Sequence, residues 1–172
     1  MKISAKENFD VCKKMIKDKQ YQPGFSLLCS TIKPMDDFSL QHQCARLFKS
    51  IPSNELKINP LKIAILASSS VEHFSEILMF WLAQEGIDAQ IFLAEFNTID
   101  QSLLDPSGKL YQFQPDLIWL FTNGKDIQSE IHLTQNEREL DQYLYNELGK
   151  FKNRWQILQK YSVKNLSLRC FL

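Results

Sequence analysis

The chain has little that would mark it as a membrane, secreted or nucleic-acid-binding protein. Its longest unbroken apolar run covers seven residues, Ile77 to Ala83, whereas a membrane-spanning helix needs about 20. Charged residues occur throughout the first 20 positions, so no secretory signal is visible. Lys and Arg number 20, as do Asp and Glu, so no net charge attracts nucleic acid or an anionic membrane. We therefore expect a cytoplasmic protein with neither kind of partner.

The sequence also lacks the usual motifs of metal and nucleotide sites. No Cys-x-x-Cys pair occurs, and the histidines are scattered, so the common zinc spacings are absent. Neither glycine-rich nucleotide fingerprint is present, nor is an Asp-x-Asp motif for magnesium. We expect no metal and no cofactor, and we expect the thiols to be buried small apolar groups. The cysteines are Cys12, Cys29, Cys44 and Cys170.

The composition is that of a globular protein of 172 residues, and its pattern changes near residue 60. Residues 1–60 read as a helical N-terminal segment, with apolar residues at helical spacing after Phe9 and after Phe38. The tripeptide Gln22-Pro23-Gly24 is typical of a break in the chain. The polar stretch from Pro52 to Pro60 predicts a linker. Residues 61–172 then form the second predicted part.

In this second part, short apolar runs alternate with helical patterns. The predicted strands are 61–67, 87–96, 116–121 and 166–171. The predicted helices are 71–85, 97–104 and 134–161, the last opened by a Thr134–Glu137 capping box. Because the strands are almost entirely apolar, both faces of the sheet must be covered. The pattern predicts an α/β fold: a three-layer sandwich with a mostly parallel sheet.

The first candidate site is the triplet Ser68-Ser69-Ser70, which follows the first predicted strand. Ligands of open α/β sheets bind at the carboxyl ends of the strands, where these hydroxyls would lie. Ser69 can serve as a nucleophile, with Ser68 and Ser70 binding substrate. Alternatively, Ser69 and Glu72 form a capping box, and the hydroxyl only satisfies the first turn of the next helix.

The second candidate site follows the strand at 116–121. Asn123 can donate its amide to a developing oxyanion, and Asp126 can bind substrate. The plainer interpretation takes Asn123-Gly124 as a turn and Asp126 as a solvated carboxylate. A serine hydrolase also needs a histidine base held by a carboxylate. No orienting carboxylate is evident for His42, His73 or His132, so a structural role is the simpler interpretation of each.

Three segments resemble the N-terminal region of FkbH-like proteins. They are residues 62–74 (KIAILASSSVEHF), 94–97 (AEFN) and 104–120 (LDPSGKLYQFQPDLIWL). The resemblance implies a flavodoxin-like fold of the SGNH/GDSL-hydrolase type, followed in complete proteins by a haloacid-dehalogenase-type phosphatase domain. It implies a role in loading a glyceryl unit from a phosphorylated three-carbon donor onto the phosphopantetheine of an acyl carrier protein. It also places Ser69 at the nucleophile position and Asn123 near the oxyanion-hole asparagine.

The catalytic motifs implied by the resemblance are incomplete here. Ala67 and Ser68 replace the Gly-Asp that precedes the nucleophile, and Asp-x-x-His is absent. We therefore expect a module that binds a carrier protein or a substrate without catalysing the reaction itself, next to a downstream phosphatase domain. The alternative is a divergent esterase or acyltransferase that uses Ser69. We also expect a chain cut short at its C-terminus, because the sheet of the family continues further.

Overall fold

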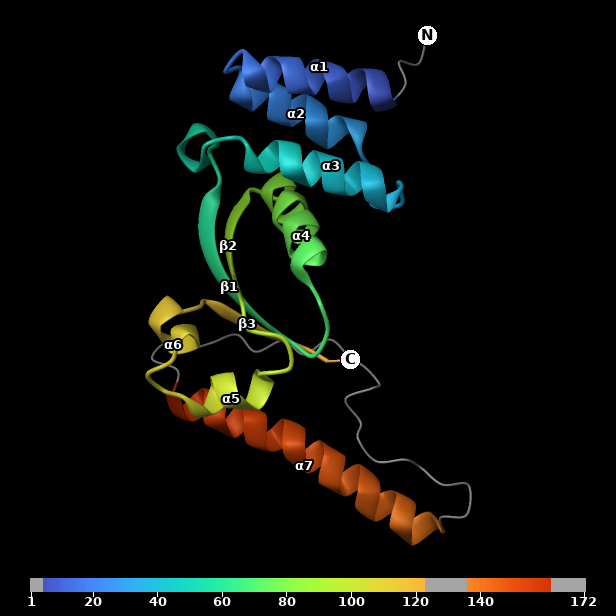
Figure 1. Cartoon of the computed structure of the whole chain (residues 1–172), viewed down its shortest axis with the longest axis vertical. Coiled ribbons are helices and arrows are strands. Elements are labelled where there is room, and N and C mark those ends of the chain that lie inside the picture. The colour runs from blue at the N-terminus through green and yellow to red at the C-terminus, as the bar shows by residue number, and fades with distance from the viewer. Residues whose placement is uncertain (1–4, 123–135, 162–172) are drawn as a thin grey trace. The chain divides into compact units, whose positions relative to one another are not determined.

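The computed structural model describes residues 5–122 and 136–161, which belong to two compact units (Figure 1). The first unit contains the residues up to Leu61 together with Val71–Gln90. The second contains Lys62–Ser70 and the residues from Ile91 onward. The helix and strand after the serine triplet therefore group largely with the N-terminal helices, although the sequence pattern suggested a boundary near residue 60.

The first unit is mainly helical. Its elements are α1 (Ala5–Lys17), α2 (Tyr21–Thr31), α3 (Phe38–Lys49), the short 3-10 helix η1 (Ser53–Glu55) and α4 (Glu72–Gln84). Figure 1 shows α1 and α2 side by side. The hydrophobic core of the first unit includes Cys12, Leu28, Cys44 and Phe80, each 0% exposed. The described cysteines are thus buried or half-buried free thiols, as expected, and burial raises the pKa of Cys44 to about 12.

The prediction that Gln22-Pro23-Gly24 breaks the chain is wrong, because these residues lie inside helix α2. Gln20 is the N-cap, so Pro23 lies in the first turn, where a missing N–H costs no intrahelical hydrogen bond. Gly24 is buried against α1, and a Cβ there would lie 3.0 Å from Ile16 Cγ1. The glycine therefore allows close helix packing rather than a turn.

The sheet has three parallel strands in the order β2-β1-β3. They are β1 (Asn59–Ala67), β2 (Ile87–Leu93) and β3 (Leu117–Phe121). β1 pairs with β3 in the register Ile63↔Leu117 through Ala67↔Phe121. Successive residues Ile63 to Ala67 are all buried, so both faces of β1 are covered. The predicted α/β fold with a parallel sheet flanked by helices is confirmed.

The second unit adds α5 (Ile99–Leu104), α6 (Lys109–Phe113) and α7 (Glu137–Tyr161). Its core joins β1 and β3 to these helices through Ala64, Leu66, Ile99, Leu103, Leu110, Ile118, Leu120 and Leu158. The short helix α6 was not predicted. The predicted fourth strand at 166–171 lies outside the described residues. No helix in the described part of the chain has both the length and the apolar character of a membrane span.

The capping box of α7 lies two residues later than predicted. Asn136 Oδ1 accepts from the backbone N–H of Glu139 at 3.0 Å, and Glu139 Oε2 accepts from the Asn136 N–H at 3.1 Å. Thr134 lies outside the described residues. Glu137, the predicted partner of Thr134, is the first residue of the helix. The pattern therefore predicted the correct kind of cap at a neighbouring position.

Candidate functional site

The serine triplet lies in the turn that follows β1. The Ser68 N–H donates to the Phe121 carbonyl at 3.3 Å, which continues the pairing of β1 with β3 beyond the strand ends. Ser68 and Ser69 are half-buried and Ser70 is exposed. The triplet thus lies at the carboxyl ends of the strands, as predicted.

The capping role considered for Ser69 is wrong. Helix α4 begins at Glu72, its N-cap residue is Val71, and no side chain caps it. The backbone carbonyl of Val71 instead accepts from Ser75 in the first turn. The Ser69 hydroxyl is therefore not used to satisfy the helix N-terminus.

The second predicted loop lies outside the described residues. Asn123 and Asp126 both follow Thr122, the last residue that the structure describes before the gap at 123–135. The strand register pairs Ala67 with Phe121, so β1 and β3 end at the same edge of the sheet. The convergence of Asn123 and Asp126 on the serine turn stays a prediction.

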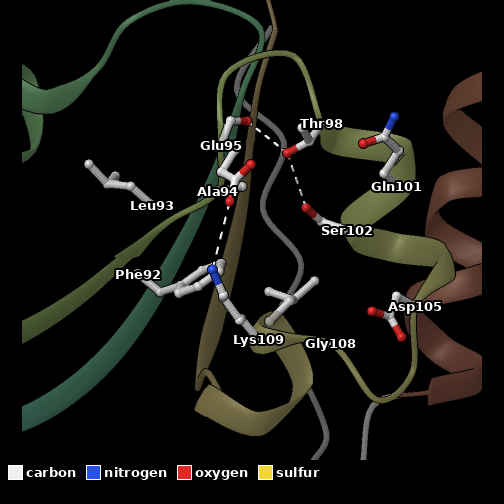
Figure 2. Close-up of a pocket in the computed structure, with 11 residues that line it drawn as sticks. Phe92, Leu93, Ala94, Glu95, Thr98, Gln101, Ser102, Asp105, Gly108 and Lys109 are labelled. Carbon is white, nitrogen blue, oxygen red and sulfur yellow. Dashed lines mark hydrogen bonds and ion pairs between the residues drawn. The ribbon is translucent and has the colours of Figure 1, made fainter.

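A pocket of about 270 Å³ lies beside this sheet edge, in the second unit, where β2 leads into α5 and α6 (Figure 2). Figure 2 shows residues from the end of β2 on one side and residues of α5 on the other. Its lining consists of Phe92, Leu93, Ala94, Glu95, Thr98, Gln101, Ser102, Asp105, Gly108, Lys109 and Leu110. The serine triplet is not part of this lining.

One wall of the pocket is a tight turn between β2 and α5. The Ala94 N–H donates to the Ile65 carbonyl at 3.1 Å, which fixes the end of β2 to β1. Thr98 donates to the Glu95 carbonyl through its N–H at 3.2 Å and its hydroxyl at 2.7 Å. Asn97 adopts a φ of 57°, a left-handed conformation that asparagine tolerates better than most residues. The turn thereby presents Glu95 and Thr98 to the pocket.

The opposite wall is the turn between α5 and α6. Asp105 Oδ1 accepts from the Ser107 N–H at 3.1 Å, and the Asp105 carbonyl accepts from the Gly108 N–H at 2.9 Å. The Tyr111 hydroxyl donates to the Leu103 carbonyl at 2.8 Å and ties α6 to the end of α5. Burial of Leu103 and Leu110 anchors both short helices in the core. These contacts hold the polar side chains on a packed framework.

The described lining residues offer hydroxyls, carboxylates and a single ammonium group. The hydroxyls of Thr98 and Ser102 lie 3.3 Å apart. Lys109 Nζ lies 3.7 Å from Glu95 Oε1, and both side chains are more than 80% exposed, so solvent weakens this pair. Asp105 adds a second carboxylate. The lining is therefore rich in hydrogen-bonding groups and carries one more acidic than basic side chain.

The interpretation of the sequence missed these pocket residues as site residues. Glu95, Asp105, Gly108 and Lys109 all lie in segments that carry the resemblance to FkbH-like proteins. That resemblance was the available signal. The serines and Asn123 match a known catalytic pattern by residue type, whereas these pocket residues match none.

A different cluster in the first unit has the donor atoms of a metal site. One ring nitrogen each of His42 and His73 and a carboxylate oxygen of Glu76 lie within 4.8 Å of one another. His42 Nε2 is 2.9 Å from Glu76 Oε2, so the carboxylate that orients this histidine exists after all. Hydrogen bonds from Lys49 and His42 lower the pKa of Glu76.

Comparisons with known proteins agree with this architecture. The structure is similar to the crystal structure of the N-terminal part of the protein BF1531 from Bacteroides fragilis, described as containing a phosphatase domain complexed with Mg. The TM-score is 0.56 and the identity 16%; the alignment covers 79% of this chain and 32% of the other, about a third of its length. No match was found among curated proteins. Residues 62–167 match the family described as FkbH, N-terminal domain, and the chain belongs to this family.

Proposed function

We propose that this FkbH N-terminal domain is a binding module for the phosphopantetheine arm of an acyl carrier protein in glyceryl transfer. The pocket between β2, α5 and α6 carries the proposal, because six of its eleven described lining residues lie in segments that resemble the family. The domain would act in the cytoplasm. It would be joined to a phosphatase domain, because the structural relative is described as containing one. Phosphatase chemistry would belong to that other domain.

The charge of the pocket favours the arm over a free phosphorylated acid. Glu95 and Asp105 offer acceptors, whereas Lys109 is the single cationic side chain among the described lining residues and is 82% exposed. A dianionic ligand would meet two carboxylates, and like charges in close contact repel one another. The amide and hydroxyl groups of a pantetheine chain can instead pair with carboxylates, hydroxyls and the side chain of Gln101. The pocket thus suits the pantetheine part of the arm, which is neutral and carries amides.

The test is a calorimetric titration of the full chain with a carrier protein in its phosphopantetheinylated and unmodified forms. We expect binding of the modified form and at least about tenfold weaker binding of the unmodified form, a difference of about 1.4 kcal/mol. Ser102→Leu should fill the pocket and weaken binding by a similar factor, while leucine keeps a good helix propensity. Leu104→Ala is the matched control, because Leu104 is on the same helix, 62% exposed and outside the lining.

Three results would contradict the proposal. They are no binding at high micromolar carrier protein, equal binding of both carrier forms, and binding that Ser102→Leu leaves unchanged. A titration with a phosphorylated three-carbon acid serves as the competing arm. Binding of that acid in the pocket, lost in Ser102→Leu, would instead make the pocket a donor site.

A second candidate function is ester hydrolysis or acyl transfer by Ser69. One observation favours it: the hydroxyl lies in the turn at the carboxyl end of β1 and does not cap α4. Hydrolysis of a short p-nitrophenyl ester should then be abolished in Ser69→Ala and retained in Ser70→Ala. Equal turnover by wild type and Ser69→Ala would remove this function.

A further inference from the structure

We propose that His42, His73 and Glu76 form a Zn²⁺ site that links α3 to α4 within the first unit. All three ligand atoms lie within 4.8 Å of one another, and His42 Nε2 is already 2.9 Å from Glu76 Oε2. The proposal is independent of the pocket in the second unit.

The donor set suits zinc. Two imidazole nitrogens and one carboxylate oxygen are ligands that Zn²⁺ accepts, and three protein ligands leave a fourth position for water. Zinc–ligand bonds of about 2.0–2.2 Å place tetrahedral ligand atoms about 3.3 Å apart. His42 Nε2 and Glu76 Oε2 are closer than this value at 2.9 Å, and no two ligand atoms are more than 4.8 Å apart, so side-chain rotations can bring all three into range. A hard ion such as Mg²⁺ would instead prefer a shell of oxygens.

The backbone places the ligands correctly before any metal arrives. His73 and Glu76 are three residues apart on α4 and therefore share a face. The ring centroids of His42 and His73 are 4.8 Å apart with the planes at 82°, so the edge of one ring faces the other ring. One residue before His42, Gln41 accepts a hydrogen bond from Trp81 Nε1 at 3.0 Å and fixes α3 against α4.

The groups around the cluster leave one carboxylate oxygen for the metal. Lys49 Nζ lies 3.1 Å from Glu76 Oε1, whereas Oε2 faces His42. Lys49 thus orients the carboxylate as an outer partner, but its charge also opposes a cation. Phe38 stacks on His42 with ring centroids 6.1 Å apart and shields one face of the imidazole. His73 is exposed, so the fourth position can be reached from solvent.

The experiment titrates the full chain with Zn²⁺ alone and records the visible spectrum with Co²⁺ in parallel. We expect a single site whose Co²⁺ spectrum lacks a thiolate charge-transfer band, because the ligands are imidazole and carboxylate. His73→Gln should weaken Zn²⁺ binding at least about tenfold, since loss of an outer partner alone costs 10–100-fold. This exposed residue can be replaced without disturbing the core, and far-UV circular dichroism confirms the fold.

Two further variants sharpen the test. Lys49→Gln should strengthen Zn²⁺ binding by about threefold to tenfold, because glutamine keeps a hydrogen-bond donor beside Glu76 and removes a nearby positive charge. Glu72→Gln is the control: it removes an exposed carboxylate of the same helix that lies outside the cluster. No binding at high micromolar Zn²⁺ would overturn the proposal and leave a simple His42–Glu76 hydrogen bond. A thiolate band in the Co²⁺ spectrum would also overturn the proposal, as would equal Zn²⁺ affinity of wild type and His73→Gln.

Discussion

At the scale of single residues, Gly108 shapes the pocket through what its missing side chain permits. A Cβ at this position would lie 2.8 Å from Asp105 Oδ2 and 3.0 Å from the Asp105 carbonyl oxygen. The same aspartate accepts from the Ser107 N–H through its other carboxylate oxygen. A side chain at position 108 would therefore displace the residue that holds the turn together.

We predict that Gly108→Ala lowers the free energy of unfolding by about 0.5–1.5 kcal/mol, because Asp105 must rotate away from Ser107 and lose that hydrogen bond. The measurement is chemical denaturation. Gly149→Ala is the matched control: none of the residues that the structure describes lies within 4 Å of its Cβ position in α7, so the change should stabilise by about 0.5–1 kcal/mol through helix propensity. Equal shifts in the same direction would contradict this account.

At the scale of elements, one ion pair ties α5 to α7. Arg154 donates to Asp100 through Nε at 2.7 Å and through Nη2 at 2.9 Å. The two residues are 54 positions apart, so this fork holds elements that are distant in the sequence. The hydrogen bonds from Arg154 lower the pKa of Asp100 below its ordinary value of 3.8, against the opposing effect of burial.

The lowered pKa of Asp100 predicts acid sensitivity. A carboxyl group with a depressed folded-state pKa adds stability above its unfolded pKa and loses it as the pH falls through the folded value. Asp100 is 62% exposed, so the contribution should be about 0.2–1 kcal/mol. We expect Asp100→Asn to be less stable than wild type at pH 7, and the difference to shrink as the pH falls below 3.8 and through the lowered folded-state pKa of Asp100.

Urea denaturation between pH 2 and pH 7 measures this difference. Glu147→Gln is the control, because it removes an ion pair with Lys150 inside α7 and leaves the α5–α7 fork intact. A gap between Asp100→Asn and wild type that stays constant over the whole pH range would show that the carboxylate charge plays no part.

At the scale of the whole molecule, two hydrophobic cores divide the chain. Leu28 belongs to the core of the first unit and Leu103 to that of the second, and both are 0% exposed. Strands β1 and β2 each pass from one unit into the other, so the chain crosses the boundary within regular elements.

We predict that Leu28→Ala and Leu103→Ala each destabilise by about 2–5 kcal/mol, because each leaves a cavity. Amide hydrogen exchange should show the largest loss of protection within the unit that carries the substitution. If either substitution lowered protection equally throughout the described residues, the two cores would unfold as one.

Much of the fold could be predicted from local patterns. The apolar run at 61–67 gave β1, the pattern after Val71 gave α4, and Gly86 follows that helix with the positive φ of 79° expected there. Local signals failed where context decided. Pro23-Gly24 reads as a break in isolation, yet packing against Ile16 makes it the first turn of α2.

The sequence by itself determined the alternation of strands and helices and the burial of β1, because both follow from the spacing of apolar side chains along a short stretch of chain. Only the tertiary structure decided which polar groups meet. Glu76 lies 2.9 Å from His42, which is 34 positions away in the sequence. Glu95 lies 3.7 Å from Lys109, although the whole of α5 separates them in the sequence. Such pairs depend on how helices pack, and packing is set by the whole core rather than by any local motif.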